Sequence, residues 1–502
     1  MKRLFFPFVS LFLLATATTA SAESRPNILF CMADDWGWPH AGAYGDEGVT
    51  TPNFDRLASE GTLFHHVYVS SPSCTPSRNA VITGKYHWEL GPGGNLHSTL
   101  PVEHESFIHL LRDNGYVTGR SPKKQWGPGK IESWEAHHGD HPVTTQHKSL
   151  EAFLEATNPG EKPFFFWLAT SDPHRGYVKG SGAQAGIDPA KAHLFAHYPD
   201  ADEVRNDVAD YYFEVQRWDA LVGSALAELE EREMLANTIV IMTGDHGMPF
   251  PRCKGNLYDS GTRVPFAVRW PAGAQAGREV EDFLSLTDVG PTLLELSGTS
   301  VPDNMTGRSF ADLLTGSGSG VLDATGRPDI VYCRERHVPA QEAPNMNGYP
   351  SRALRTRDVL YIRNYKPDLW PAGTGGGNTN YPNQWFADCD GGPTKDYIYE
   401  NREKDAVHAR AFELCFAKRP AEELYFLPND PDQVVNLASD PEQAEVLKAM
   451  AARLDERLLA LNDPRASDPD TTVFDGHPYL GGGGGAKKGK NLAKDPEAGT
   501  PP

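Results

Sequence analysis

From residue 26 onward, two patterns of hydrophobic residues alternate along the chain. Short continuous apolar runs, at residues 27–32, 163–169 and 238–243, are typical of strands whose two faces are both buried. Between these runs, apolar residues recur at helical spacing, most clearly over residues 52–59 and 204–231. A chain that alternates strands with amphipathic helices favours an α/β fold. We therefore predict a large, mostly parallel sheet sandwiched by helices.

The pattern changes after about residue 325. Residues 349–365 contain the alternating apolar and polar positions of half-exposed strands, and residues 367–393 are rich in glycine, asparagine and proline. Residues 441–461 have the spacing of an amphipathic helix with a proline in its first turn. These features predict a smaller C-terminal α+β domain packed on the larger one.

The first residues have the three parts of a secretory signal peptide. A basic start at residues 1–3 precedes an apolar run over residues 4–15 and small residues at 20–22. No later stretch is long and apolar enough to cross a bilayer, so we expect a periplasmic or secreted protein with no membrane attachment after signal cleavage. The expected parts are a signal peptide over 1–22, an N-terminal domain over 23–325, a smaller domain over 326–480 and a disordered Gly/Lys/Pro-rich tail over 481–502.

The charge and cysteine content of the chain limit the kinds of molecule or metal that it is expected to bind. The net charge of -20 argues against a surface that binds nucleic acid. An anionic substrate would need local positive charge, for which Lys123-Lys124 and Arg334 to His337 are candidates. Six cysteines without CxxC spacing argue against thiolate zinc sites, while Cys389 and Cys415 could form a disulfide.

Polar, chemically capable residues follow each predicted strand directly. Asp34 and Asp35 follow the first strand, His174 follows the second, and Asp245 and His246 follow the third. Ligands in open α/β sheets bind outside the carboxyl ends of the strands, so these side chains are expected to converge. Three carboxylates provide the hard oxygen ligands that Ca²⁺ or Mg²⁺ prefers. The alternative is that each pair is an ordinary turn after a strand.

Cys74 lies between two prolines where a short helix is expected to begin. With Thr75 as the cap and the next proline in the first turn, the thiol would lie at the positive end of the helix dipole. The alternative is a buried apolar cysteine. The polar neighbours Ser73, Ser77 and Arg78 are unusual for a core position, and an exposed lone thiol is a liability in an exported protein.

The residues around Cys74 resemble a known family. Cys74-Thr-Pro-Ser-Arg78, followed by Thr83-Gly84, is similar to the Cys-x-Pro-Ser-Arg signature of type I sulfatases, in the alkaline phosphatase-like superfamily. Other stretches resemble the family's two metal motifs and its closing motif: NILFCMADDWG, GDHG and EELYFLPNDPDQVVNLA. The heparan N-sulfatase (sulfamidase) branch is the most similar, through SPKKQWGPG, ATSDPHRGY and GMPFPRCKGNLY.

The resemblance implies an alkaline phosphatase-like fold, a cofactor and a covalent mechanism. A formylglycine-generating enzyme would oxidise Cys74 to formylglycine (3-oxoalanine), whose hydrate attacks sulfur before sulfate is expelled. The implied Ca²⁺ ligands are Asp34, Asp35, Asp245, His246 and the modified Cys74. The other implied roles belong to Arg78, which orients the hydrate, Lys123 and Lys254, which bind sulfate oxygens, and His174, which protonates the leaving group.

One position departs from the family pattern. Where the family has Gly-Lys-x-His, this chain has Pro122-Lys-Lys-Gln125, and glutamine cannot act as a general base. The missing histidine would take a proton as the sulfated intermediate collapses. Either another group substitutes, with His137, His138 and His141 as candidates, or turnover slows after sulfur transfer.

Three further residues are candidates for binding the substrate. Arg334, Glu335 and His337 follow a probable strand at a place where the sulfamidase branch carries substrate contacts. An arginine is suited to the planar carboxylate of a sugar acid. The alternative is a solvated loop of mixed charge.

Together these features predict an exported sulfatase that uses formylglycine and Ca²⁺ to remove O-sulfate or N-sulfamate groups from a sulfated carbohydrate such as a glycosaminoglycan. A phosphoesterase of the same superfamily is the first alternative, although such enzymes often use Thr or Ser as nucleophile and bind two metals. A catalytically weakened protein that binds sulfated glycans is the second, and Gln125 is its support.

Overall fold

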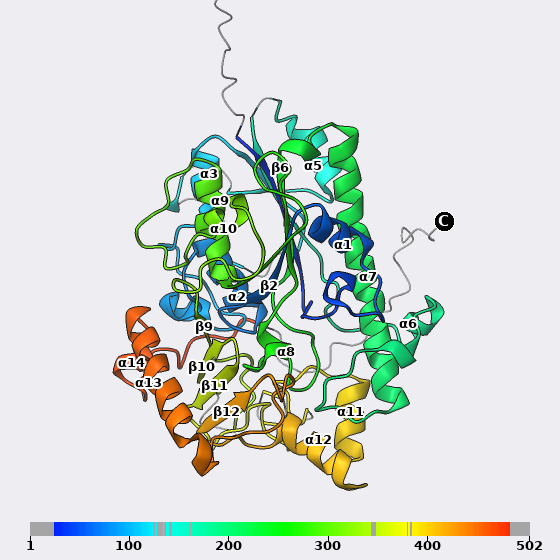
Figure 1. The fold of residues 1–502 in the computed structure, drawn as a ribbon, viewed down its shortest axis with the longest axis vertical. Coiled ribbons are helices and arrows are strands. Elements are labelled where there is room, and N and C mark those ends of the chain that lie inside the picture. The colour runs from blue at the N-terminus through cyan, green and yellow to red at the C-terminus, as the bar shows by residue number, and fades with distance from the viewer. Residues whose placement is uncertain are drawn as a thin grey trace, which may run out of the picture.

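The computed structural model contains two sheets, one large and one small (Figure 1). It describes residues 25–123, 126–127, 134, 137–139, 143–160, 162–342, 348–378, 380–381 and 384–481. The expected signal peptide, Lys124, Gln125, His141 and the tail beyond residue 481 lie outside the described residues.

The large sheet has eight strands in the order β4-β3-β5-β1-β6-β7-β2-β8. Neighbouring strands are parallel except at β7, which runs antiparallel to both β6 and β2. The strands are β1 (Asn27–Ala33), β2 (Thr62–Tyr68), β3 (Val117–Arg120), β4 (Thr145–Gln146), β5 (Phe164–Ala169), β6 (Thr238–Gly244), β7 (Phe266–Arg269) and β8 (Arg278–Ser285). The central strands β1, β5 and β6 are buried along their whole length, as their continuous apolar runs predict.

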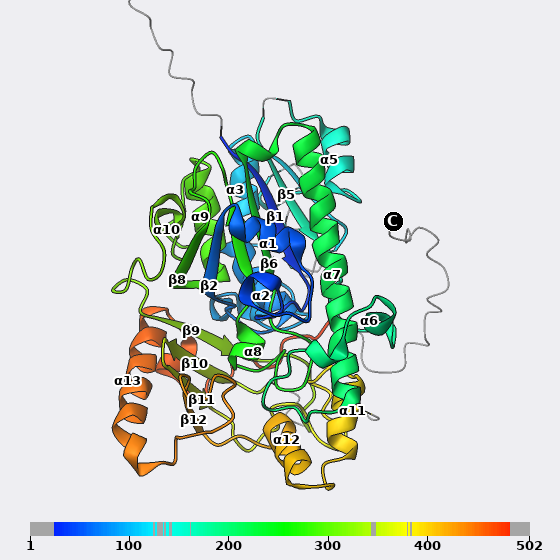
Figure 2. The same cartoon turned by 45° about the vertical axis from the view of Figure 1, so that its right-hand side comes forward.

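Helices cover both faces of this sheet (Figure 2). On one face, α1 (Pro52–Ser59), α5 (Leu150–Thr157) and α7 (Asp202–Glu231) bury a core that includes Phe54, Phe153 and Trp218. On the other face lie α2 (Cys74–Thr83), α3 (Phe107–Asp113), α9 (Val289–Leu296) and α10 (Ala311–Thr315), whose apolar side chains form a second core. Helix α1 starts at Pro52, a position in the first turn where proline is well tolerated.

The smaller sheet lies beyond the carboxyl ends of the central strands (Figures 1 and 2). Its four antiparallel strands, in the order β12-β11-β10-β9, are β9 (Asp329–Arg334), β10 (Ser351–Thr356), β11 (Val359–Asn364) and β12 (Glu422–Phe426). Around it are α11 (Pro393–Glu400), α12 (Ala406–Phe416), α13 (Ala444–Ala460) and α14 (Pro464–Ser467), and the short helices α6 (Ser181–Gln184) and α8 (Asp259–Thr262) precede it in the chain. The predicted fold class is confirmed, while the domain boundary near residue 325 stays a prediction.

The expected disulfide between Cys389 and Cys415 is wrong. All six cysteines of the chain are free and buried. The Cys389 thiol lies 3.6 Å from the carbonyl of Asp390, and the Cys415 thiol lies 3.9 Å from that of His197. Burial raises the pKa of Cys389 to about 11, so its thiol stays protonated.

Within the described part of the chain, no helix combines the length and the apolar composition that crossing a membrane requires.

Buried ion pairs tie the small sheet to the segment that follows α13. Arg352 of β10 is fully buried and donates to Asp463, with Nη2 3.0 Å from Oδ1. Arg465 of α14 donates to both carboxylate oxygens of Glu335, at 2.7 and 2.8 Å. Because burying these charges is costly unless they are paired, each partner depends on the other.

We expect Asp463→Ala to destabilise the protein by about 3–5 kcal/mol, because the guanidinium of Arg352 would stay buried without this partner. Thermal unfolding followed by circular dichroism measures the loss. In the matched control, Asp455→Ala removes the exposed partner of Arg363 and should cost less than about 1 kcal/mol. Equal losses in the two variants would contradict this account.

Candidate active site

Two neighbouring strands bring three carboxylates and an imidazole together. Ala33 of β1 is in register with Gly244 of β6, so the residues that follow each strand leave the sheet side by side. The backbone N–H of Asp35 donates to Asp245 Oδ1 at 2.9 Å. Asp35 has a φ of 70°, a left-handed conformation that aspartate tolerates better than most residues. All of the side chains that converge here are fully buried: Asp34, Asp35, Asp245 and His246.

Cys74 completes this group, which we call the strand-end cluster. Its Sγ lies 3.1 Å from His246 Nε2 and 3.9 Å from Asp35 Oδ1. The ligand atoms of Asp34, Cys74 and Asp245 also lie within 4.8 Å of one another. In the expected mature protein, the oxygens of a formylglycine hydrate would stand near the position of this sulfur. Burial raises the pKa of the Cys74 thiol well above its usual value, so the unmodified side chain is a poor nucleophile.

The helix that carries Cys74 begins earlier than the sequence predicts. The expected cap was Thr75, whereas α2 starts at Cys74 and Ser73 is its cap residue. The Ser73 hydroxyl makes no capping bond and is instead hydrogen-bonded to His337 Nδ1 at 2.8 Å. Thr75 accepts a hydrogen bond from the backbone of His97.

Three cations, Arg78, Lys123 and Lys254, neutralise the buried carboxylates. Arg78, one turn after Cys74, donates from Nε to Asp245 at 2.8 Å and from Nη2 to Asp34 at 3.3 Å. Lys123 Nζ, beyond the end of β3, lies 2.7 Å from Asp34. Burial by itself would raise the pKa of Asp34, but the positive charges of Arg78 and Lys123 outweigh it and lower this pKa.

Lys254 and His174 approach the cluster from the side of Asp35. Lys254 Nζ donates to Asp35 Oδ2 at 3.0 Å, and His174 Nε2 lies 3.9 Å from the same oxygen. The Nδ1 of His174 is bonded to the carbonyl of Arg175, so the proton on that nitrogen is fixed and Nε2 faces Asp35. The His174 side chain is 32% exposed, which leaves it accessible to a bound molecule.

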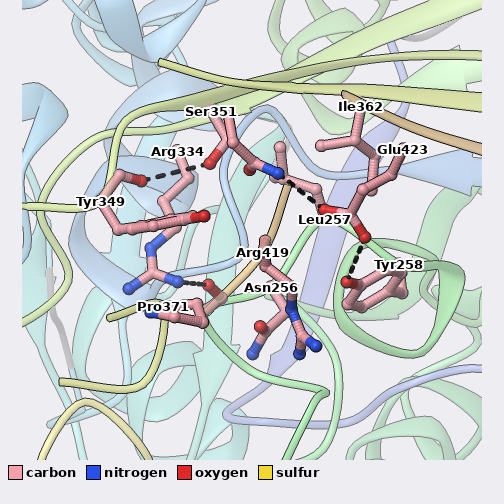
Figure 3. Close-up of a pocket in the computed structure, with 12 residues that line it drawn as sticks. Asn256, Leu257, Tyr258, Arg334, Tyr349, Ser351, Ile362, Pro371, Arg419 and Glu423 are labelled. Carbon is pink, nitrogen blue, oxygen red and sulfur yellow. Dashed lines mark hydrogen bonds between the residues drawn. The ribbon is translucent and has the colours of Figure 1, made fainter. Parts of the chain in front are cut away.

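The structure gives different surroundings to the three residues that were predicted to contact the substrate, Arg334, Glu335 and His337. The Arg334 guanidinium donates to the carbonyl of Gly255 and pairs with Asp388, and it lines a small pocket beside Tyr349 (Figure 3). It therefore supports the loop that carries Lys254. Glu335 lies outside the cluster, where Arg352 and Arg465 bind its carboxylate, so the expected sugar contact has no support in this geometry.

His337 is the member of that trio that lies beside the cluster, through its bond to Ser73. Burial lowers its pKa well below the usual value, which keeps the imidazole neutral. Two of the three candidate replacements for the missing histidine, His137 and His138, lie in the described residues and have other partners, while His141 lies outside them. His138 Nε2 is bonded to the carbonyl of Val102 at 2.6 Å, and His137 is exposed and packs on His138.

Sequence reasoning missed Asp390, which precedes α11. Its Oδ2 lies 3.2 Å from Lys254 Nζ, so Lys254 is held between Asp35 and Asp390. Asp390 belongs to a glycine-, asparagine- and proline-rich stretch with no motif around it. A contact between two loop residues so far apart in sequence leaves no local pattern that could have revealed it.

Comparison with known proteins agrees with this arrangement. The profile of the sulfatase family matches residues 26–299, more than half of the 502 residues. The chain belongs to the sulfatase family.

Individual relatives are similar over most of their length. An ulvan-active sulfatase of Formosa agariphila is 28% identical over 437 residues, which cover 85% of this chain and 79% of that protein. The human N-sulphoglucosamine sulphohydrolase is 29% identical over 494 residues, which cover 89% of this chain and 93% of that protein. A structure solved with its substrate D-glucosamine-2-N,6-O-disulfate superposes with a TM-score of 0.60 at 18% identity, covers 88% of this chain and 99% of that one, and shows the same fold.

We expect Arg78→Ala to destabilise this sulfatase by about 3–5 kcal/mol, since two buried carboxylates would lose their shared guanidinium. Thermal unfolding is the measurement, because it does not depend on modification of Cys74. Arg56→Ala, which removes a half-exposed arginine of α1, is the matched control and should change stability by less than about 1 kcal/mol. A wild-type melting temperature for Arg78→Ala would contradict the assigned role.

Proposed function

We propose that this sulfatase is an exported, formylglycine-dependent, Ca²⁺-binding enzyme that hydrolyses O-sulfate or N-sulfamate groups on a sulfated carbohydrate such as a glycosaminoglycan. The observation that carries the proposal is the position of Cys74 at the start of α2, beside Asp35 and His246. The relatives that act on ulvan or on N-sulphoglucosamine support a carbohydrate substrate.

The donor set of the strand-end cluster fits a hard divalent cation. Asp34, Asp35 and Asp245 offer carboxylate oxygens from two adjacent strand ends, and His246 adds a nitrogen. When bound, Ca²⁺ would polarise the sulfate and the hydrate of residue 74, whose oxygen would supply the nucleophile. The carboxylates are already held in place by their pairs with Arg78, Lys123 and Lys254.

The chain's own cations account for recognition of the sulfate. Lys123 and Lys254 carry their ammonium groups on either side of the cluster, where each can bind a sulfate oxygen. Arg78 is fully buried, so it acts on residue 74 and the carboxylates rather than on the carbohydrate. In this role its fixed charge stabilises negative charge that develops during transfer.

His174 is placed to deliver a proton to the leaving group. The hydrogen bond from its Nδ1–H to the carbonyl of Arg175 keeps one proton on that nitrogen, so His174 would act as an acid in its imidazolium form, giving up the Nε2 proton and returning to the neutral ring. Its partial exposure allows a sugar oxygen or nitrogen to approach. The hydroxyl or amine would then leave as a neutral group.

Maturation and location are also part of the proposal. The basic, apolar and small-residue segments of residues 1–22 support export, and the Cys74-Thr-Pro-Ser-Arg78 motif supports recognition by a formylglycine-generating enzyme. We propose the periplasm or the medium as the place of action.

We expect the peptide that contains Cys74 to carry an aldehyde when the protein is produced together with a formylglycine-generating enzyme. Intact mass spectrometry of that peptide distinguishes the aldehyde from the heavier thiol. Cys74→Ala should lower sulfate release by about a thousandfold or more, because the nucleophile is lost.

Cys415→Ala is the matched control, since it removes another buried cysteine and should leave sulfate release near the wild-type rate. An unmodified thiol at residue 74 in an active preparation would refute the proposed mechanism.

Removal of divalent cations should lower both thermal stability and sulfate release, because the clustered carboxylates lose their counter-charge. Adding Ca²⁺ at about 100 times its Kd should restore about 2.7 kcal/mol of stability. The melting temperature after chelation and after Ca²⁺ addition is the measurement. Asp245→Asn should show a much smaller shift, whereas Asp368→Asn, at an exposed position, should respond like wild type. The same shift in all three proteins would rule out this site.

A further inference from the structure

We propose that Asp390 is a specificity-determining residue of the active site. Its carboxylate accepts a hydrogen bond from a hydroxyl or amine of the sugar near the sulfate that is removed, and it repels a second anionic group at that position. The inference rests on the proposed function and adds a property of the substrate to it.

The two residues before Asp390 are held by the part of the chain that contains the small sheet and α11. Asp388 accepts a hydrogen bond from the N–H of Val338 at 2.7 Å and pairs with Arg334. Lys395 of α11 donates to the carbonyl of Cys389 at 2.8 Å. These contacts hold the intervening residue at a defined position against the ends of the central strands.

The Asp390 carboxylate faces the groups proposed to act on the substrate. Its Oδ2 lies 3.2 Å from Lys254 Nζ, and a positive charge on His174 also acts on it. Its side chain is 29% exposed, although Oδ2 itself is buried against Lys254, so the exposed surface belongs to the rest of the side chain. The carboxylates of Asp34 and Asp35 are fully buried. Asp390 can therefore meet a bound sugar, while the strand-end carboxylates are enclosed.

Asp390 is ionised at neutral pH. Burial alone would raise its pKa, but the positive charge of Lys254 and the nearby His174 lower it below the usual value. An ionised carboxylate can only accept hydrogen bonds.

A negative charge beside a site for an anionic sulfate is unfavourable unless it meets a donor. Sugar hydroxyls and ammonium groups are donors, whereas a second sulfate or a carboxylate is repelled. An interface that places a like charge against unwanted ligands gains selectivity at the expense of some affinity. The geometry of Asp390 therefore selects substrates that are singly charged near the scissile bond.

A purely structural Asp390 would act only by holding Lys254 in place. Its loss would then slow all substrates by the same factor, since every sulfate would meet the same displaced ammonium group. A change in the ratio between substrates would require contact with the sugar. The two roles are separated by selectivity rather than by overall rate.

The test uses the full-length, formylglycine-containing enzyme and glucosamine that carries either one or two sulfates at the 2-N, 3-O and 6-O positions. The kcat/KM for sulfate release is measured for the best singly sulfated sugar and for its doubly sulfated forms. We expect wild type to favour the singly sulfated sugar over at least one doubly sulfated form, and Asp390→Asn to reduce this preference about tenfold, or about 1.4 kcal/mol. Asp390→Glu keeps the charge and should retain most of the preference, and the exposed Asp368→Asn should behave like wild type.

An unchanged ratio in Asp390→Asn, with both substrates slowed alike, would overturn the specificity role and leave the proposed function intact. Equal kcat/KM values of wild type for the singly and the doubly sulfated sugars would overturn it too. Failure of wild type to release sulfate from every sulfated glucosamine, while it hydrolyses 4-nitrophenyl sulfate, would instead show that sulfated glucosamine is not its substrate, and the inference would fall with it.

Discussion

The burial of three carboxylates at the ends of two adjacent strands is the constraint on which the site depends. Asp34, Asp35 and Asp245 have no exposed surface, and such charges are tolerated only when they are paired. The pairing charges come from α2, from the end of β3 and from the loop after β6. The need to neutralise the strand ends therefore couples the position of α2 to that of the central sheet, and it places Cys74 among the carboxylates.

The small sheet takes part in the site as well as packing against it. Arg334, at the end of β9, holds the carbonyl of Gly255, next to Lys254. His337 binds the hydroxyl of Ser73, next to Cys74, and Asp390 pairs with Lys254 itself. Each of these contacts reaches a residue beside or within the strand-end cluster, so a shift of the small sheet would move the groups that surround Cys74.

Buried ion pairs near the site also prevent some charged residues from contacting a substrate. Arg334 and Glu335 lie next to each other at the end of β9, yet both are paired with protein groups. Arg334 pairs with Asp388, and Glu335 pairs with two arginines. A charged residue near an anion site is therefore not necessarily a ligand contact. The partial exposure of His174 and Asp390 distinguishes these two side chains from Arg334 and Glu335, whose charged groups are enclosed by protein partners.

The sequence by itself determined the fold class, the central strands and the convergence of Asp34, Asp35, His174, Asp245 and His246 beyond the strand ends, because apolar runs and the polar residues that follow them are local patterns. Family resemblance also placed Cys74, Lys123 and Lys254 beside these residues. Only the tertiary structure decided that Ser73 rather than Thr75 occupies the N-cap position of α2, that Cys389 and Cys415 stay apart as thiols, and that Asp390 joins the site while Glu335 does not. Those outcomes depend on how two sheets pack and on which charges meet across them, and residues distant in sequence carry no local pattern of such pairing.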